Sequence, residues 1–292
     1  MNLYGMLTFP KAGDQRMPDQ ITPVAALALI GFGEAGSTFA RAAGWEATAR
    51  AWDIAPDRRS AMTEAGVVVA AGAAEALAGV PLVLSLVTAD QALAVAETYA
   101  PHLAPGALWC DMNSVAPETK RAAALAIEAA GARYVDVAVL APVDPARLNV
   151  PLLVAGAEAD EAVAALGAAG FAKVRSVGSE VGRASAIKMI RSVMVKGVEA
   201  LTAEMMLAAE AAGVVDEVLA SLDASEKAQG WVDWAAYNLE RMATHGVRRA
   251  AEMEEAVKTL AALGVEPVMT AGTVRRQREA AAQSRKLIGN SA

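Results

Sequence analysis

LALIGFGEAGSTFA, residues 27–40, carries the strongest local signal in the chain. An apolar run that favours a β-strand is followed at once by Gly31-Phe32-Gly33-Glu34-Ala35-Gly36 and then by a helical pattern. In such a G-x-G-x-x-G turn, the first glycine permits the tight turn, the second lets a pyrophosphate approach the backbone, and the third lets the helix pack on the strand. The free N–H groups and the dipole at the start of the helix then hold the anion. These six residues are therefore predicted to bind a dinucleotide, and the alternative is a glycine-rich turn of some other α/β protein.

One acidic residue, Asp53, supports the dinucleotide interpretation. It lies at the end of the next predicted strand, 22 residues after Gly31, where a carboxylate accepts hydrogen bonds from the adenosine ribose hydroxyls. A carboxylate there also repels a 2′-phosphate, so Asp53 favours NAD over NADP. Arg58 and Arg59 follow closely and can reach such a phosphate, which keeps NADP open. The structural alternative for Asp53 is a turn or helix-cap residue before Pro56.

Strand-like and helix-like segments alternate after the glycine loop as far as about residue 180. Strands are predicted at 24–30, 47–54, 67–70, 81–87, 107–112, 132–139, 151–156 and 172–177. Helices are predicted at 35–45, 56–65, 89–100 and 117–130. Strands that alternate with helices at this spacing form right-handed βαβ units, so we expect an α/β fold with a doubly wound parallel sheet.

The second part of the chain, from Gly182 onward, is almost entirely helical in pattern. The stretch 183–212 is expected to form one helix of about 30 residues, roughly 45 Å long, that links the two halves. Interruptions of the helices are expected at Gly213, Gly230, Gly246, Gly264–Pro267 and Gly272. We therefore expect a flexible extension at 1–22, a dinucleotide-binding domain at 23–180, and an all-α substrate and dimerisation domain at 181–292.

Composition limits the classes of protein to which the chain can belong. Its 292 residues are 55% hydrophobic and 20% charged, with a formal net charge of −7, which argues against a disordered chain and against a duplex nucleic-acid binder. Cys110 is the single cysteine and the chain has two histidines, so we expect neither an intrachain disulfide nor a metal cluster. No apolar run reaches the roughly 20 residues of a membrane span, and residues 1–22 lack the pattern of a signal peptide. We expect a soluble protein of the cytoplasm.

Polar residues follow the strand predicted at 107–112, at the edge where open α/β sheets bind ligands. In DMNSVAPET, residues 111–119, Asn113 and Ser114 can orient a substrate carboxylate or hydroxyl. The structural alternative is helix capping, with Ser114 as the N-cap and a proline and a glutamate in the first turn. Both interpretations can hold together.

The glycine loop together with DMNSVAPETKR, residues 111–121, resembles the β-hydroxyacid dehydrogenase superfamily, which includes 6-phosphogluconate and 3-hydroxyisobutyrate dehydrogenases. NSVAPET is similar to the NS-x-x-x-x-T segment of the phosphogluconate branch. Members join a Rossmann domain to an all-helical domain through a long helix, and they usually dimerise through the helical domain, so the resemblance implies this architecture and a homodimer. It also implies that Leu86-Val87-Thr88 passes under the nicotinamide ribose, and an ordinary strand-end turn is the alternative.

The resemblance places a catalytic lysine near the start of the long helix. In GSEVGRASAIKMIRS, residues 178–192, Gly182 and Lys188 stand at the expected spacing. Lys188 is thereby implied to be the general acid/base that exchanges a proton with the substrate hydroxyl, and the alternative is a solvated lysine on a long helix. The family asparagine four residues later is Ser192 here, and we expect it to orient the substrate with Asn113 and Ser114.

Two departures from the family concern the substrate. The second glycine of the turn before the lysine is Ala184 here, and the usual D-A-P-V-S-G-G segment reads DVAVLAP at 136–142. That segment shapes the substrate pocket in the family, so the resemblance does not imply the usual substrates.

A polar helix face follows in THGVRRAAEMEEAVKTL, residues 244–260, where His245, Arg248 and Arg249 share one side. Arg248 and Arg249 are candidates for binding an anionic substrate, because arginine makes bidentate contacts with carboxylates and phosphates. A solvated, salt-bridged face is the alternative. The pattern resembles a poorly characterised helical C-terminal domain found on some members of the superfamily.

These patterns together predict an NAD(P)-dependent oxidoreductase that acts on the hydroxyl or carbonyl group of a small, anionic substrate. Neither a nucleic acid nor a membrane is expected as a partner. Two alternatives stay open: an imine reductase-like NADPH enzyme, against which the retained Lys188 counts, and a non-catalytic dinucleotide-binding sensor.

Overall fold

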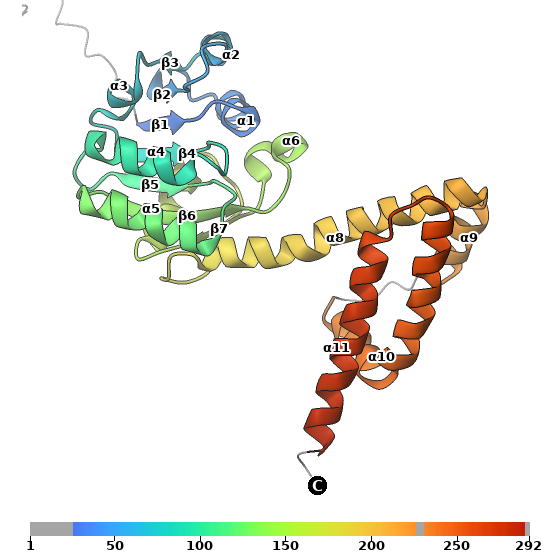
Figure 1. Cartoon of the computed structure of the whole chain (residues 1–292). Helices are drawn as coiled ribbons and strands as arrows, with labels where there is room; N and C mark the ends of the chain where they lie inside the picture. The colour runs from blue at the N-terminus through green and yellow to red at the C-terminus, as the bar shows by residue number, and fades with distance from the viewer. Residues whose placement is uncertain (1–25, 226–230, 290–292) are drawn as a thin grey trace, which may run out of the picture. The chain divides into compact units, whose positions relative to one another are not determined.

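The computed structural model describes residues 26–225 and 231–289, and the chain divides into two compact units, Met1–Met189 and Ile190–Ala292 (Figure 1). The first unit is built on a β-sheet and the second consists of helices. The extension predicted at 1–22 lies outside the described residues. The domain boundary predicted between residues 180 and 181 stays a prediction.

An eight-stranded sheet with the strand order β3-β2-β1-β4-β5-β6-β7-β8 forms the centre of the first unit. Its strands are β1 (Leu27–Ile30), β2 (Ala49–Trp52), β3 (Val68–Val69), β4 (Leu82–Ser85), β5 (Leu108–Asp111), β6 (Arg133–Val139), β7 (Leu152–Ala155) and β8 (Val174–Ser176). Each lies within a predicted strand, and all neighbours pair in parallel except β6 and β7. The prediction of parallel pairing is wrong for β6 and β7. Their connection holds only two short helical turns, at Val143–Ala146 and Arg147–Asn149, and no full helix of the kind that usually crosses between parallel strands.

Helices cover both faces of this sheet (Figure 1). They are α1 (Glu34–Ala43), α2 (Arg58–Glu64), α3 (Ala73–Leu77), α4 (Ala92–Tyr99), α5 (Pro117–Ala129), α6 (Val143–Ala146) and α7 (Ala159–Ala168), with single turns at Glu46–Thr48, Ala100–His102 and Arg147–Asn149. Residues of β1 alternate between two apolar clusters: Leu29 belongs to the cluster of Phe39 in α1, and Ile30 belongs to the cluster of Ile127 in α5. The sheet is therefore buried on both faces, as in doubly wound α/β folds.

The carboxyl ends of the central strands meet at one edge of the sheet. Ile30 at the end of β1 pairs with Trp52 of β2 and with Ser85 of β4, and Ser85 pairs in turn with Asp111 of β5. The strand order reverses at β1, which lies between β2 and β4. Open α/β sheets bind their ligands at such a switch point, outside the carboxyl ends of the strands.

The helical half of the described chain contains α8 (Arg183–Ala212), which begins in the first unit, and α9 (Val215–Ser225), α10 (Trp231–Ala262) and α11 (Val268–Gly289). The 30 residues of α8 confirm the long helix predicted at 183–212. None of the helices in the described segments combines the length and the apolar character that a membrane crossing requires.

Two of the predicted helix interruptions are wrong, because Gly246 and Gly272 lie inside α10 and α11. A Cβ on Gly246 would stand 2.3 Å from the backbone oxygen of Gln277, so this glycine lets α10 approach α11 closely and does not end the helix. α8 does end next to Gly213, and α10 ends two residues before Gly264. Gly230 lies outside the described residues.

A carboxylate of α8 fixes the start of α11 within the helical unit. Glu204, with only 7% of its surface exposed, accepts hydrogen bonds from the backbone N–H groups of Met269 (2.7 Å) and Thr270 (2.9 Å) and from the Thr270 hydroxyl. Burial acts to raise the pKa of Glu204, but these hydrogen bonds outweigh burial and lower the pKa below its ordinary value.

Candidate functional site

The glycine loop turns between β1 and α1 at the carboxyl edge of the sheet. Gly31 has a φ of +96°, and a Cβ there would stand 2.4 Å from the backbone oxygen of Leu86. A Cβ on Gly36 would stand 2.5 Å from the backbone oxygen of Gly31. Both positions therefore require glycine, because a side chain would overlap backbone atoms that cannot easily move.

Gly33 differs from these two glycines, because a Cβ there would meet nothing within 4 Å. It is the N-cap of α1, and Glu34 and Ala35 follow in the first helical turn. The first N–H groups of a helix have no acceptor within the helix, and they form the positive end of its dipole. The open space at Gly33 and these N–H groups together fit an anion such as a pyrophosphate.

Asp53 connects the end of β2 to the glycine loop. Its carboxylate accepts hydrogen bonds from the backbone N–H groups of Phe32 (2.6 Å) and Ala55 (2.8 Å). The bond from Phe32 fixes the glycine loop. The bond from Ala55 closes a turn, so Asp53 also has the role of a turn residue, which was the structural alternative for it. A carboxylate has about four acceptor positions, so two remain for ribose hydroxyls. Phe32 itself points into the core, where its side chain is fully buried.

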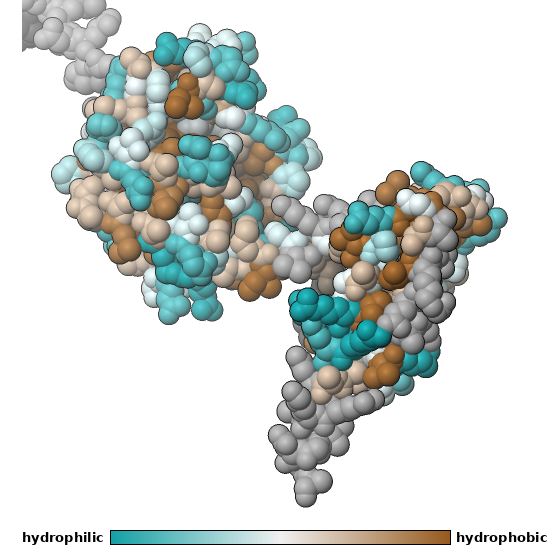
Figure 2. Space-filling view, in the orientation of Figure 1, coloured by the Kyte–Doolittle hydropathy of each residue, from teal (hydrophilic) through white to brown (hydrophobic). Residues whose placement is uncertain are grey.

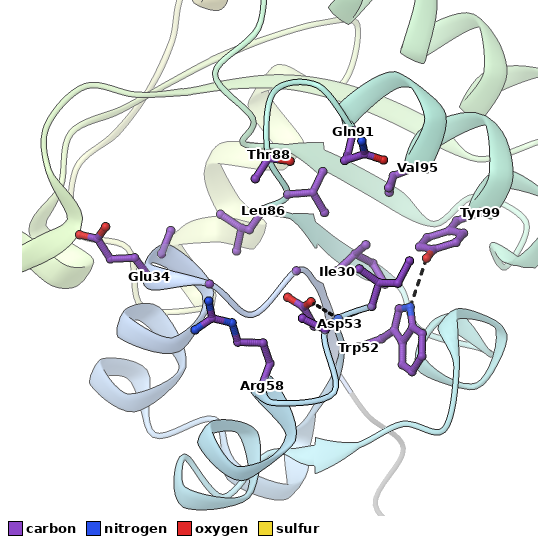
Figure 3. Close-up of a pocket in the computed structure, with 16 residues that line it drawn as sticks. Ile30, Glu34, Trp52, Asp53, Arg58, Leu86, Thr88, Gln91, Val95 and Tyr99 are labelled. Carbon is purple, nitrogen blue, oxygen red and sulfur yellow. Dashed lines mark hydrogen bonds between the residues drawn. The ribbon is translucent and has the colours of Figure 1, made fainter.

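A cavity of about 410 Å³ opens in front of the glycine loop (Figure 3). Its lining residues come from the β1–α1 loop, the end of β2 and the start of α2, and from the segment after β4 together with α4. They are Ile30, Gly31, Gly33, Glu34, Ala35, Trp52, Asp53, Ile54, Ala55, Arg58, Leu86, Val87, Thr88, Gln91, Val95 and Tyr99. Arg58 and Asp53 both line this cavity, and the indole N–H of Trp52 donates a 3.2 Å hydrogen bond to the hydroxyl of Tyr99 at one end (Figure 3). Of the residues predicted to contact the cofactor, Phe32 and Gly36 are buried and do not line this cavity.

A second cavity of about 420 Å³ adjoins the first and shares four lining residues with it. The shared residues are Glu34, Ala35, Leu86 and Val87, and the others are Ala89, Met112, Asn113, Ser114, Val139, Ala141, Pro142, Val143 and Lys188. Lys188, half-buried in α8, donates a hydrogen bond from Nζ to the hydroxyl oxygen of Ser114. The structure thus brings Lys188, Asn113 and Ser114 together with the segment predicted to shape the substrate pocket.

Asn113 joins the loops that follow β4 and β5. Its side-chain oxygen accepts a hydrogen bond from the backbone N–H of Val87 (2.7 Å), and its side-chain nitrogen donates to the hydroxyl of Ser85 (3.0 Å). The side chain is buried, so these bonds hold the backbone of Val87 at the wall that the two cavities share.

The capping interpretation of Ser114 is wrong. The N-cap of α5 is Ala116. Pro117 is at the first helical position and Glu118 is in the first turn, so the proline and the glutamate do lie in the first turn, as expected from the sequence. The helix begins two residues later than a cap at Ser114 requires, and the Ser114 hydroxyl instead accepts the hydrogen bond from Lys188.

Sequence reasoning missed a buried ionic cluster next to this loop. Lys120 of α5 contacts Asp111 (3.0 Å) and Asp136 (3.5 Å), and none of the three side chains is more than 1% exposed. The Tyr134 hydroxyl donates to Asp111 (2.7 Å); burial raises its pKa well above the ordinary value, and the Asp111 carboxylate adds to the shift. Burial also raises the pKa of the Cys110 thiol to about 12. The available signal was the presence of three ionisable residues at positions where the apolar pattern points inward.

Asp136 holds the turn that precedes Lys188. Its carboxylate oxygen accepts hydrogen bonds from the backbone N–H groups of Gly182 (3.1 Å) and Ser185 (2.9 Å). Gly182 has a φ of +98°, which favours glycine. Ala184, which departs from the family pattern, is fully buried between these two residues, so its methyl group is accommodated in the core.

Three other predicted site residues belong to the second unit. Ser192 is half-buried in α8, Arg248 is exposed in α10, and Arg249 is half-buried beside it. His245 and Arg248 line a cavity of about 360 Å³ within the helical unit. The roles predicted for Ser192, Arg248 and Arg249 in substrate binding stay predictions.

Both parts of the chain match known protein families. Residues 26–175 match the family model of the NAD binding domain of 6-phosphogluconate dehydrogenase, and residues 209–280 match a domain of unknown function, DUF1932. A curated relative from Methanothermus fervidus, an uncharacterized 28.5 kDa protein in the 5′ region of 7S RNA, is 28% identical over 188 residues, which cover 64% of this chain and 71% of the relative.

Solved structures resemble this chain over most of its length. A conserved hypothetical protein from Sinorhizobium meliloti 1021 is 40% identical over 88% of each chain, with a TM-score of 0.58. A conserved protein of unknown function with structural similarity to 3-hydroxyacid dehydrogenases is 29% identical over 89% of this chain and 97% of its own, with a TM-score of 0.58. An imine reductase from Myxococcus stipitatus in complex with NADP⁺ is 18% identical over 88% of this chain and 94% of its own, with a TM-score of 0.73, a likeness of fold.

Proposed function

Because the chain belongs to the family of the NAD binding domain of 6-phosphogluconate dehydrogenase, we propose that it is an NAD(P)-dependent oxidoreductase acting on a small acidic substrate. In the proposed reaction, hydride moves between the nicotinamide and the carbon of a hydroxyl or carbonyl group. Lys188 is the proposed general acid/base. The relation to hydroxyacid dehydrogenases in fold supports this choice of chemistry.

One observation carries the proposal: the cavity that contains Lys188 adjoins the cavity in front of the glycine loop. A dinucleotide in the first cavity and a small molecule in the second would meet at Leu86 and Val87, which line both. Hydride transfer requires that the two reactants be held in contact with each other. The shared wall supplies a place for that contact.

The residues around the first cavity fit a dinucleotide. The open space at Gly33 and the start of α1 would hold the pyrophosphate, and Asp53 would hold the adenosine ribose. When bound, the nicotinamide supplies the acceptor or donor of hydride. Asp53 favours NAD, whereas Arg58 lines the same cavity and can pair with the 2′-phosphate of NADP. NAD is therefore the proposed cofactor and NADP the alternative.

Lys188 would move the proton that accompanies hydride transfer. Oxidation of an alcohol releases the hydroxyl proton as hydride leaves the carbon, and reduction of a carbonyl returns one proton to the oxygen. The neutral amine at Nζ can accept that proton and the ammonium can return it. Ser114, which accepts a hydrogen bond from Nζ, would orient the amine, and Asn113 would hold the backbone of Val87 beside the reacting groups.

The second cavity suits a short substrate with one anionic group. Among the described residues, its charged lining side chains are Lys188 and Glu34, and the wall at Val139 and Ala141–Val143 is apolar. An ammonium group attracts a substrate carboxylate, whereas Glu34 at the wall shared with the first cavity would repel it. We therefore expect the carboxylate to point away from Glu34.

The test is turnover of short 2- and 3-hydroxy acids with NAD, and of the matching oxo acids with NADH, by the wild type, Lys188→Ala and Lys173→Ala. Lys173 is an exposed lysine of the first unit that lines neither cavity, so it controls for loss of a lysine. Lys188→Ala should lower kcat by about 10²–10⁴-fold, with unchanged NADH affinity, and Lys173→Ala should change neither.

Each contrary result identifies which part of the proposal is wrong. Undiminished turnover by Lys188→Ala would remove the lysine from the mechanism. Reduction of cyclic imines with NADPH, without any reaction of oxo acids, would establish the imine reductase alternative. Tight cofactor binding with no turnover of either class would establish the dinucleotide-binding sensor.

A homodimer formed through the helical domain is also part of the proposal. Ile190, Met194, Val198 and Leu201 recur at helical spacing on α8 and are 46–73% exposed, and Figure 2 shows hydrophobic side chains on the surface of the helical unit. Apolar side chains that gather on one helix face favour burial against another protein surface. Sedimentation at micromolar concentration should give a dimer, and a monomer would contradict this part.

A further inference from the structure

The ionic cluster of Lys120, Asp111 and Asp136 lies outside both cavities, and the mechanism proposed above does not use it. The Lys120 side chain is fully buried, and its Nζ donates hydrogen bonds to the backbone oxygen (2.6 Å) and the carboxylate (3.0 Å) of Asp111. Its distance to the Asp136 carboxylate is 3.5 Å, and that oxygen has no hydrogen-bond partner. A single ammonium group thus stands between two carboxylates from neighbouring strands.

The first carboxylate of the cluster fixes the loop that carries Ser114. Asp111 accepts hydrogen bonds from the backbone N–H of Asn113 (2.9 Å) and from the hydroxyl of Tyr134 (2.7 Å). Asn113 is held in addition by Ser85 and Val87. Ser114 follows directly, so the position of its hydroxyl depends on this tie to Asp111.

The second carboxylate fixes the helix that carries Lys188. Asp136 accepts hydrogen bonds from the backbone N–H of Gly182, directly before α8, and from the backbone N–H of Ser185, in its first turn. Lys188 is three residues after Ser185 and therefore lies on the same side of the helix, one turn further on. The positive end of the α8 dipole compensates part of the second negative charge.

We propose that Lys120 is a positioning residue, which holds the loop of Ser114 and the first turn of α8 at a fixed separation so that Ser114 Oγ and Lys188 Nζ meet. Both partners of the Ser114–Lys188 hydrogen bond are anchored, through Asp111 and Asp136, to the same buried ammonium group. The catalytic meaning of this inference rests on the proposed function of Lys188, whereas the positioning itself does not.

Stability alone is a poor explanation for such a cluster. Apolar residues of similar volume often replace buried ionic groups with no loss of stability, or with a gain, because desolvation of the charges is costly. In contrast, Asp111 and Asp136 together accept hydrogen bonds from five different donors. Such directional bonds define a geometry that apolar packing does not define. The donors come from the loop after β5, from α5, from β6 and from the start of α8.

The first test is backbone amide exchange in full-length Lys120→Met, with Lys173→Met as the matched control. Methionine is unbranched like lysine and one atom shorter, so it keeps most of the side chain and removes the charge. In the folded variant, exchange at Asn113, Gly182 and Ser185 should be faster than in the wild type by roughly tenfold or more. The amides of the glycine loop and the affinity for NADH should stay unchanged. Unchanged exchange at all three amides in a folded protein would overturn the proposal.

A second variant keeps the inference testable if Lys120→Met does not fold. Asp111→Asn/Lys120→Met removes one charge of each sign and leaves Asp136 bonded to Gly182 and Ser185. Faster exchange at these two amides would support the proposal, because only their tie to Lys120 has been lost. If neither variant folds, the cluster is a general stabilising element and the proposal is wrong.

The reactivity of Lys188 provides a readout that general stability does not change. Acetic anhydride modifies Lys188 and Lys173 in the same chain, and mass spectrometry gives the ratio of the two rates. Lys120→Met and Ser114→Ala should each change this ratio by roughly threefold or more, and their combination should change it no further than Ser114→Ala alone. Additive effects, or no effect of Lys120→Met, would overturn the proposal.

The two proposals fail in distinguishable ways. If Lys188→Ala retains full turnover while the exchange and reactivity results hold, the proposed function is wrong and the positioning is right. If Lys188→Ala abolishes turnover while Lys120→Met leaves exchange, reactivity and turnover unchanged, the proposed function is right and the positioning is wrong.

Discussion

Replacement of Gly33 by alanine should separate cofactor binding from folding. The added Cβ would meet no protein atom within 4 Å, and the φ of Gly33 is −73°, outside the left-handed region that favours glycine. The methyl group would nevertheless project into the space that a pyrophosphate needs in front of α1. The variant should therefore fold normally and bind NADH poorly.

The expected magnitudes follow from these two facts. Alanine is a poorer N-cap than glycine, at a cost of about 0.5–1 kcal/mol in the free energy of unfolding. For a protein of 292 residues, that cost lowers Tm by only about 1–2 °C. Displacement of the pyrophosphate by the methyl group should weaken NADH binding at least tenfold, which is about 1.4 kcal/mol.

Energy transfer from tryptophan to NADH measures the affinity, because Trp52 lines the cavity. Gly72→Ala is a matched control. Gly72 is the N-cap of α3, and a Cβ there would meet nothing within 4 Å, but Gly72 does not line the cavity. Gly72→Ala should show the same small drop in Tm and the NADH affinity of the wild type. Wild-type NADH affinity in Gly33→Ala would refute the assignment of the glycine loop.

Two further predictions concern carboxylates. Asp53→Asn, which removes the negative charge at the ribose end of the cavity, should raise the affinity for NADPH relative to NADH by about tenfold in fluorescence titrations. Arg58→Ala should lower the affinity for NADPH relative to NADH. An unchanged ratio of the two affinities in both variants would show that neither residue selects the cofactor. Glu204→Gln should lower the free energy of unfolding at neutral pH by about 1–3 kcal/mol in denaturant titrations, because charge-assisted hydrogen bonds to Met269 and Thr270 are weakened. The pKa of Glu204 in the folded protein lies below the ordinary 4.5. The contribution of Glu204 to the free energy of unfolding is therefore complete above pH 4.5 and is lost as the pH falls through the folded pKa. If acid lowers the free energy of unfolding equally in the wild type and in Glu204→Gln, this prediction is contradicted.

The order of strands and helices could be predicted from the sequence because local patterns determine it. The apolar run before Gly31 forms β1, and the helix predicted at 183–212 is α8 to the residue. The direction of β7 could not be predicted in this way, because an apolar run such as PLLVAG suits a parallel and an antiparallel strand equally well. Only the length and shape of the connection to β6 decide between them.

The cavities could be predicted only in part. The glycine loop and Asp53 are close in sequence and carry a spacing that physical rules interpret. The proximity of Lys188 to Ser114 came from family resemblance, because 74 residues separate the two. Lys120 gave only a weak signal. It shares a helix face with Ala123, Ala124 and Ile127, but a lysine in the first turns of an alanine-rich helix is usually solvated. Its burial depends on Asp111 and Asp136, which reach it only through the pairing of β5 and β6.

Transfer of deuterium to an oxo acid, from NADH that carries deuterium at both C4 positions, tests the central claim most directly. The wild type is incubated with the labelled NADH and a mixture of short 2- and 3-oxo acids, and mass spectrometry analyses the hydroxy acids that form. The account predicts a hydroxy acid that carries one deuterium, and its loss in Lys188→Ala but not in Lys173→Ala. Bound NADH with no labelled hydroxy acid, or equal labelling by Lys188→Ala, would contradict the account.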